Sequence, residues 1–364
     1  MEQWKEYKLG DISNMKYGKL PPKQNKGSYP IWSGYRNVGF ATTYNCRKGT
    51  IVVVARGVGG TGDVKISSED CFLTNLSIAV ELDNKICEPL YFYYKYKLSN
   101  LRYLDTGSAQ SQITIDDLKR LSLKLPPLEE QKRITEILSS IDYKIELNCR
   151  INDNLEQQAQ ALFKDWCDGC TETVEIGQIA TNVLDYTPNR NKQVRLINSS
   201  DITEGIFGEY PLVENINLKG HFKKRFKKGD ILYSEIRPRN HHYGYVLFDG
   251  DEYVISTRLM VIRNIPNMVS APVLYQYLLL PEVEEHFVLK TESRSGTFPQ
   301  GSYTDLATIR VPFAREQNNI TNSLDKIRQK IYSSQRENHY LTALRDALLP
   351  KLMSGELKID KVEM

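Results

Sequence analysis

A glycine-rich stretch that follows an apolar run is the first pattern that could carry chemistry. Residues 57–62, Gly-Val-Gly-Gly-Thr-Gly, have the G-x-G-x-x-G spacing of a dinucleotide-binding turn. That function needs a helix after the last glycine, because the helix N-terminus receives the pyrophosphate. Residues 63–82 instead alternate and are rich in β-branched side chains, which predicts strands. Asp63 also stands where a phosphate-binding loop needs its lysine. We therefore expect Gly57–Gly62 to form a tight turn between strands.

Cys167 and Cys170 have the C-x-x-C spacing of a thioredoxin-type redox motif. Such a motif belongs at a helix N-terminus, which lowers the thiol pKa, whereas this pair follows a predicted long helix. A zinc site would need two further ligands, and the sequence has no second C-x-x-C. We favour a helix end with a turn at Asp168-Gly169. No metal or other cofactor is expected.

Length and composition are typical of a globular protein with more than one domain. The chain has 364 residues, of which 26% are charged and 40% hydrophobic. No apolar run approaches the roughly 18 residues of a membrane span, so we expect a cytoplasmic protein without membrane contact. Residues 219–228 hold six lysines and arginines interleaved with Phe222 and Phe226, a pattern that suits a polyanion surface.

An internal repeat organises the whole chain. Residues 125–169 align without a gap with residues 311–355, and Gln131 aligns with Gln317. Upstream, KGTIVVVAR at 48 matches KGDILYSEIR at 228, and EPLYFYY at 88 matches APVLYQY at 271. One unit of about 180 residues is therefore used twice. The second copy has RPRNHHYG in place of the glycine run, which predicts a variable recognition surface there.

Each copy ends in a predicted long helix with an apolar pattern of seven residues. Two apolar positions per heptad are typical of a coiled-coil seam, and both helices place polar residues in the middle heptad. The polar middle heptads of the two helices lie opposite each other only if the helices pack antiparallel. The alternative is that each helix packs on its own domain. The predicted seam comprises Ile134, Leu138, Ile141, Ile145, Asn148 and Asn152, continued by Leu155 and Leu162, and Ile320, Leu324, Ile327, Ile331, Ser334 and Asn338.

The helix starts, LPPLEEQKRI and VPFAREQNNI, and the helix ends, ALFKDW and ALLPKLMSGEL, resemble the specificity subunit of type I restriction-modification systems. This resemblance covers essentially the whole chain. It implies two target-recognition domains that each read one half of a bipartite site in double-stranded DNA. It also implies a spacer coiled coil that docks two methyltransferase subunits, and nuclease/translocase subunits that can join. The chain itself would catalyse no reaction and bind no cofactor.

The predicted fold is α+β, with two tandem strand-rich target-recognition domains, each followed by a long helix, and an antiparallel coiled coil of the two helices. We expect the recognition domains at 1–127 and 171–312, the first spacer helix at 128–170, and the second spacer helix with a C-terminal tail at 313–364. A helix over residues 129–167 would be roughly 58 Å long at ~1.5 Å per residue. That length corresponds to about 17 base pairs at ~3.4 Å each.

Polar and basic side chains on loops are the candidates for DNA contact, because base edges need donors and acceptors and phosphates need cations. The first domain offers Ser33, Tyr35, Arg36, Asn37, Arg56, Ser108, Gln110 and Gln112. The second offers Asn198, Ser199, Lys223, Lys224, Arg225, Arg237, Arg239, Asn240, His241, His242, Arg294 and Ser295.

Two other classes of function stay open at this point. One is a coiled-coil protein-interaction scaffold without a DNA role. The other is a nucleotide or redox enzyme that uses Gly57–Gly62 or Cys167/Cys170. Cofactor absorbance or thiol–disulfide turnover would support the enzyme, and salt-dependent DNA binding would exclude the scaffold.

Overall fold

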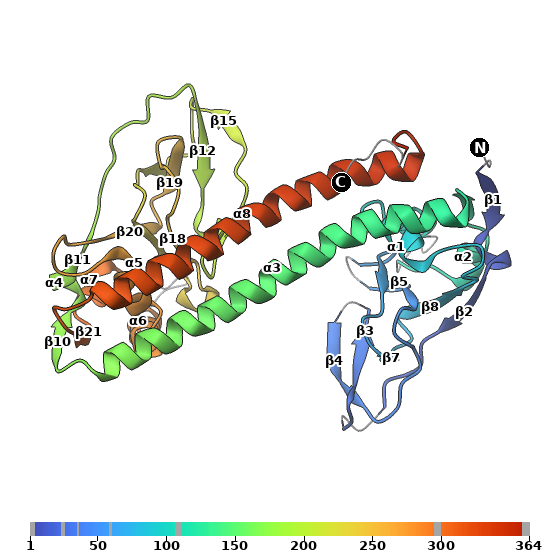
Figure 1. Cartoon of the computed structure of the whole chain (residues 1–364), viewed down its shortest axis with the longest axis horizontal. Helices are drawn as coiled ribbons and strands as arrows, with labels where there is room; N and C mark the ends of the chain where they lie inside the picture. Colours follow the sequence, from blue (N-terminus) through green and yellow to red (C-terminus); the bar gives the residue numbers. More distant parts are fainter. Residues whose placement is uncertain are drawn as a thin grey trace. The chain divides into compact units, whose positions relative to one another are not determined.

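The computed structural model of the chain describes residues 4–22, 26–34, 36–57, 60–105, 111–294 and 300–358. It divides into two compact units, Met1–Lys144 with Leu341–Met364, and Ile145–Tyr340. Two long helices, α3 (Leu128–Asp168) and α8 (Asn318–Ser354), contribute a segment to each unit. Figure 1 shows α3 in green and α8 in red. Over the described residues, no helix combines the length and apolarity needed to cross a bilayer.

The first unit is built on a four-stranded antiparallel sheet beside a smaller three-stranded sheet (Figure 1). The large sheet has the order β2 (Ser13–Tyr17), β8 (Ser77–Leu82), β5 (Ile51–Val54), β6 (Val64–Ile66). The small sheet has the order β4 (Arg36–Ala41), β3 (Tyr29–Ser33), β7 (Phe72–Leu73). Strand β1 (Lys5–Lys8) pairs with β9 (Ser122–Leu125). The short helices are η1 (Leu9–Asp11), α1 (Pro89–Lys97), η2 (Arg102–Leu104) and α2 (Ile115–Lys119).

The second unit has two four-stranded sheets. One has the order β11 (Ala180–Asn182), β20 (Leu259–Asn264), β17 (Ile231–Ser234), β18 (Tyr243–Tyr245). The other has the order β15 (Leu212–Glu214), β12 (Gln193–Ile197), β19 (Tyr253–Ser256), β16 (Phe222–Lys224). Strand β10 (Glu172–Glu175) pairs with β21 (Arg310–Phe313), and β13 (Ile202–Thr203) with β14 (Ile206–Phe207). The short helices are α4 (Ile176–Ile179), η3 (Ser199–Asp201), η4 (Pro238–Asn240), α5 (Ala271–Leu278), α6 (Pro281–Glu292) and α7 (Tyr303–Ala307).

The repeat predicted from the sequence is present in the order of these elements. The sheet β2-β8-β5-β6 corresponds to β11-β20-β17-β18, and α1 corresponds to α5. Helices α2 and α7 also correspond, because both begin with a capping box, Thr114 with Asp117 and Ser302 with Asp305. Among the described elements, α6 is an addition of the second copy.

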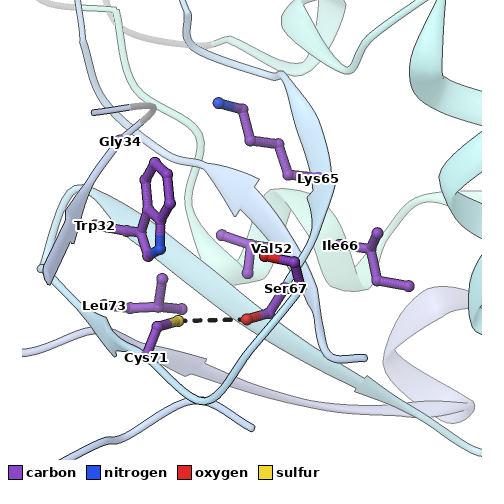
Figure 2. A pocket seen from close by; sticks show the side chains of 9 residues that line it. Trp32, Gly34, Val52, Lys65, Ile66, Ser67, Cys71 and Leu73 are labelled. Carbon is purple, nitrogen blue, oxygen red and sulfur yellow. Dashed lines mark hydrogen bonds between the residues drawn. The ribbon is translucent and has the colours of Figure 1, made fainter. Parts of the chain in front are cut away.

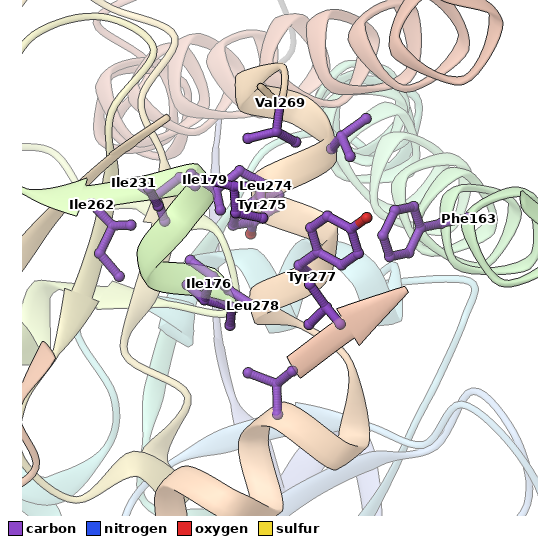
Figure 3. Packing of buried hydrophobic residues seen from close by; sticks show 14 of the residues in the cluster. Phe163, Ile176, Ile179, Ile231, Ile262, Val269, Leu274, Tyr275, Tyr277 and Leu278 are labelled. Carbon is purple, nitrogen blue, oxygen red and sulfur yellow. The ribbon is translucent and has the colours of Figure 1, made fainter. Parts of the chain in front are cut away.

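Both long helices bury apolar side chains against the strand-rich part of each unit. In the second unit, Phe163 of α3 packs edge-on against Tyr277 of α5, with ring centroids 5.0 Å apart, and Leu324 of α8 joins the same cluster. Figure 3 shows this cluster around α5. In the first unit, Leu138 of α3 and Leu352 of α8 lie in one core. The helices therefore pack on the domains as well as on each other.

Helices α3 and α8 contact each other in antiparallel order. In the second unit, the Asn148 amide donates to Asn338 at 2.8 Å, and Glu156, further along α3, binds Arg328, which is earlier in α8. Rising numbers in α3 thus meet falling numbers in α8. Polar groups that satisfy each other at a buried seam fix the register of the two helices.

Nine of the twelve predicted seam residues are buried, and Ile145, Asn152 and Asn338 are half-buried. The continuation to Leu162 was wrong, because this side chain is 44% exposed and Phe163 is buried in its place. An α-helix has 3.6 residues per turn, so a strict seven-residue pattern drifts off the buried face along a long helix. The buried seam residues are Ile134, Leu138, Ile141, Asn148, Ile320, Leu324, Ile327, Ile331 and Ser334.

Candidate nucleic-acid interface

Three segments that carry predicted DNA-contact residues lie close together in the first unit. Ser33 and Arg36 pair across the β3–β4 turn, where Gly34 has a φ of 63°. A Cβ on Gly34 would lie 4.0 Å from the carbonyl oxygen of Arg56. Arg56 in turn forms an isolated antiparallel bridge with Gln112. The hairpin turn, the end of β5 and the segment before α2 therefore present polar side chains at one place.

The backbone at this place is held by short polar contacts. Asn37 accepts a hydrogen bond from the Gly39 N–H at 2.9 Å, which fixes the start of β4. The Asp105 carboxylate accepts from the Gln112 N–H at 2.8 Å. Arg36, Asn37 and Arg56 have exposed side chains. The predicted contacts Tyr35, Ser108 and Gln110 lie outside the described residues.

The glycine-rich stretch ends in a turn between strands, as the sequence predicts. The Gly62 N–H donates to Val54 O at 2.9 Å, and Gly62 O accepts from the Leu101 N–H at 2.7 Å. Strand β6 begins at Val64, so no helix N-terminus follows to receive a pyrophosphate. Gly62 has a φ of 91°, and a Cβ there would lie 2.3 Å from Arg102 N. Glycine is thus required by backbone packing.

In the second unit, η4 forms the loop that replaces the glycine run. Its flanking residues Arg237 and His241 have φ values of 48° and 53°, in the left-handed region that few side chains adopt. Such strain persists only where neighbours hold it, and it gathers at functional loops. Arg239 is held by Glu292 at the end of α6, with Nε 2.9 Å from Oε1.

His241 is fixed by two carboxylates. Its Nδ1 lies 2.9 Å from Glu204 Oε1, and its Nε2 lies 2.8 Å from Glu284 Oε1. The hydrogen bond to Glu204, with the further contribution of Glu284, raises the pKa of His241 above its ordinary value of 6.5. His242 Nδ1 lies 2.7 Å from Ile202 O. The described residues contain no group of three His, Cys, Asp or Glu side chains that could hold a metal. These contacts hold both histidines in the loop, and DNA contact by His241 or His242 stays a prediction.

Arg294 lies on a segment that contacts this loop region. It donates to Gln300 O at 2.5 Å and to Asp305 at 2.8 Å. Gln300 forms an isolated bridge with Ile236, the residue before Arg237. This bridge is the counterpart of Arg56–Gln112 in the first copy, so both copies join the end of the central strand to the segment before the capped helix. Ser295 lies outside the described residues.

The basic cluster is only partly a surface feature, and the DNA contact predicted for Lys224 is wrong. Lys224 is 2% exposed, and its ammonium group donates to Leu259 O at 2.8 Å. Side chains alternate between the two faces of a strand, so the neighbouring Lys223 is exposed. Arg225 is half-buried and lies 3.8 Å from Asp251. Lys223 is therefore the exposed lysine of β16.

Asn198 and Ser199 have local structural roles. Asn198 caps η3, and its side chain accepts from the Ser199 N–H at 3.0 Å. Ser199 is 6% exposed, so the DNA contact predicted for it was also wrong. Small polar residues before a short helix turn are common caps, and the sequence could not separate that role from base contact.

Two buried glutamines connect the long helices to the strand-rich domains. They align with each other in the internal repeat, but the sequence assigned them no role. Gln131 donates to Ile86 O at 3.0 Å and to Pro126 O at 2.9 Å. Gln317 donates to Met268 O at 3.1 Å. The signal was present in the repeat, since the same amide stands at the same place in both helix starts.

The C-x-x-C pair lies at a helix end, as the sequence predicts. Cys167 is in the last turn of α3, and burial raises its pKa to about 12. Burial also raises the pKa of Cys170. Both thiols are free, and a redox motif needs a thiol with a lowered pKa.

Comparison with known proteins agrees with this architecture. The family model described as the type I restriction modification DNA specificity domain matches residues 1–157 and again residues 172–343. The chain belongs to this family. The family is one of non-catalytic specificity subunits, which is what the resemblance implied.

Named relatives and a solved structure point the same way. The type I restriction enzyme HindI specificity subunit of Haemophilus influenzae is 35% identical over 191 residues, 51% of this chain and 40% of that protein. The MjaIX specificity subunit of Methanocaldococcus jannaschii is 21% identical over 420 residues, 99% of this chain and 95% of that protein. The crystal structure of a type I restriction-modification S subunit from M. genitalium has a TM-score of 0.64 at 19% identity and covers 96% of both chains, which shows a shared fold.

Proposed function

We propose that this chain is the DNA-specificity subunit of a type I restriction-modification complex, and that each strand-rich domain reads one half of a bipartite site. The observation that carries the proposal is the doubled fold, in which each copy matches the DNA specificity domain and presents its own polar surface. The first surface comprises Ser33, Arg36, Asn37, Arg56 and Gln112. The second comprises Arg237, Arg239, Asn240 and Arg294, and Lys223 is proposed to contact a phosphate of the DNA backbone.

The two polar surfaces differ in the loops that carry them, as is expected of two domains that recognise different DNA sequences. The first is built on a hairpin turn beside a glycine turn, and the second on η4 braced by α6. A shared sheet with unlike loops lets two copies of one fold read unlike bases. Exposed arginines and asparagines supply the donors and acceptors that base edges recognise.

The long helices are proposed as an antiparallel coiled coil that sets the spacing between the half-sites. Helix α3 has 41 residues, a length of roughly 62 Å at ~1.5 Å per residue, or about 18 base pairs at ~3.4 Å each. The contact of Asn148 with Asn338 and that of Glu156 with Arg328 support a single register. We propose that the spacer helices are α3 and α8, which lie within the predicted segments 128–170 and 313–364.

The helices are also proposed to dock two methyltransferase subunits, with nuclease/translocase subunits able to join. Leu147, Ile151 and Leu162 on α3 are 38%, 36% and 44% exposed. Apolar side chains exposed along a helix favour a partner surface. In this arrangement the chain supplies recognition and its partners supply the chemistry, so it needs no cofactor of its own.

The test is reconstitution of the full chain with methyltransferase subunits of a type I system. We expect salt-dependent binding of double-stranded DNA and adenine methylation within a site of two separated halves. Arg56→Ala should relax the sequence preference at one half of the DNA site, and Arg237→Ala should relax it at the other half. The control variant Lys85→Ala, at an exposed lysine, should change the preference at neither half. A coiled-coil scaffold without a DNA role would give assembly of the subunits without sequence-dependent binding.

A further inference from the structure

Cys46 and Cys71 face each other directly across two antiparallel segments of the first unit. They form an isolated antiparallel bridge, with Cys46 N–H to Cys71 O at 3.0 Å and Cys71 N–H to Cys46 O at 2.9 Å. Residues that exchange both hydrogen bonds have Cα atoms about 5.5 Å apart. This separation lies within the range that a disulfide spans without backbone movement.

Each thiol has a polar neighbour, and the Cys46 Sγ donates to Arg47 O at 3.7 Å. The Ser67 Oγ lies 3.4 Å from the Cys71 Sγ, a contact drawn in Figure 2. The facing Cys46 thiol, assisted by Ser67, lowers the pKa of Cys71 to about 7, against the opposing effects of burial, Glu69 and Asp70, and the pKa of Cys46 is raised. By contrast, burial raises the pKa of the Cys87 thiol to about 12. Cys71 therefore combines a facing thiol with a stabilised thiolate.

A pocket lies beside Cys71, which is itself 1% exposed. Its volume is about 160 Å³, and Trp32, Lys65, Ser67 and Cys71 are among its lining residues (Figure 2). That space accommodates a molecule of a few heavy atoms. Lys65 also lines the pocket, and Figure 2 shows its ammonium group pointing away from Cys71.

We propose that Cys46 and Cys71 form an oxidisable dithiol site that takes a hydroperoxide and closes into a reversible intrachain disulfide. The Cys71 thiolate attacks one oxygen of hydrogen peroxide, and the O–O bond breaks. Hydroxide is the leaving group, and Cys71 becomes a sulfenic acid. The Cys46 sulfur then attacks the Cys71 sulfur, and its proton and the sulfenic OH leave as water. Two thiols are oxidised to one disulfide while one peroxide is reduced to two waters. A dithiol reductant reverses the bond.

The disulfide would close the loop that runs from Cys46 to Cys71. This loop contains β5, Arg56 and the Gly62 turn. Cys71 also directly precedes β7, whose Leu73 pairs with Trp32 of β3. Cross-linking a loop of this size restricts the unfolded chain and raises stability. This inference goes beyond the proposed function and does not depend on it.

The test uses the full chain, reduced and then treated with hydrogen peroxide under native conditions. Peptide mapping should find Cys46 linked to Cys71 with loss of two hydrogen atoms, and Tm should rise by on the order of 5–10 °C. A dithiol reductant should reverse both changes. In Cys46→Ser, a sulfenic-acid probe such as dimedone should label Cys71, since no facing thiol remains to resolve it. In the matched control Cys167→Ser with Cys170→Ser, the rise in Tm should persist.

Mapping of the unmutated chain keeps the inference open to refutation even if a variant fails to fold. It is overturned if Cys46 and Cys71 both stay reduced while the exposed Cys149 is oxidised, because the oxidant was then active. It is also overturned if Cys71 accumulates sulfenic or sulfinic acid without linkage to Cys46. A linked peptide without a rise in Tm would overturn the stabilising role.

Discussion

Arg328 of α8 binds Glu156 of α3 through both terminal guanidinium nitrogens, and its guanidinium carbon lies 4.7 Å from the centre of the Tyr275 ring. By the repeat, Arg328 is the counterpart of Asp142 in α3. Asp142 also pairs across to the other helix, where it accepts from Arg345 at 2.7 Å. The two copies therefore carry opposite charges at an equivalent position.

This difference favours pairing of α3 with α8 over pairing of either helix with a second copy of itself. In the same register, α3 against α3 would place Glu156 opposite Asp142. Helix α8 against α8 would place Arg328 opposite Arg345. Like charges at such positions select the partner by repulsion as well as attraction.

The buried pair gives the first prediction. Glu156→Arg should lower the free energy of unfolding by about 3 kcal/mol, because Arg328 is 4% exposed and would lose its carboxylate. Adding Arg328→Glu should restore much of the loss. Denaturant unfolding of the full chain measures both. The control Glu146→Gln removes the exposed partner of Arg150 and should cost less than about 0.5 kcal/mol. Equal losses in the control and the Glu156 variant would contradict the account.

The adjacent lysines of β16 give a second, matched prediction. Lys224→Ala should lower the free energy of unfolding by roughly 1–3 kcal/mol, because Leu259 O and Glu235 lose a buried partner. Lys223→Ala should leave stability unchanged and flatten the dependence of log K on log salt by about 0.9. Thermal unfolding and salt titration of DNA binding separate the two. A flatter salt slope in the Lys224 variant, without loss of stability, would restore that lysine as a DNA contact.

The glycine turn gives a third prediction. Gly62→Ala should destabilise the first unit by more than Gly49→Ala, although both glycines have positive φ, 91° and 81°. A Cβ at Gly62 would lie 2.3 Å from Arg102 N, whereas a Cβ at Gly49 meets no atom within 4 Å. Left-handed strain alone costs about 1–2 kcal/mol, and the clash adds to it at Gly62. Unfolding free energies of the two variants decide the point, and equal losses would show that packing at the turn is unimportant.

His241 predicts a pH dependence. Its raised pKa means that the folded state favours the imidazolium. The stabilisation is fully present below the ordinary pKa of 6.5 and is lost as pH rises through the raised folded value. His241→Asn should therefore be less stable than the unmutated chain at pH 6, and this difference should shrink toward pH 9. His221→Asn is the control. A pH-independent difference would mean that Glu204 and Glu284 hold a neutral ring.

The sequence predicted the repeat, the long helices and most of the seam, because apolar spacing and helix-start residues are local signals. Spacing could not show that Phe163 replaces Leu162, since the helical period drifts from seven residues over a long helix. Lys224 was misassigned because a strand buries every second residue, and a run of like charges does not reveal which face is inward. The pairing of Cys46 with Cys71 depends on contacts between distant segments, which no local pattern records.

The spacer proposal predicts the effect of paired insertions. Four residues added after Ile145 in α3 and four after Tyr340 in α8 lengthen both helices by about 6 Å and turn them by ~400°. The methylated site should keep both half-sequences and gain one or two unread base pairs at ~3.4 Å each. Insertion in α3 alone should break assembly, because one helix is lengthened while its partner is not. An unchanged spacing in the paired variant would show that the helices do not set the distance between the two half-sites.

The most direct test of the central claim is to sequence methylated adenines in DNA modified by the full complex, before and after a domain exchange. The segment from about Val174 to Thr308 is replaced by that of another family member. If each domain reads one half-site, one half of the methylated sequence should change while the other half and the spacing stay the same. Simultaneous change of both halves, or of neither, would contradict the two-reader account.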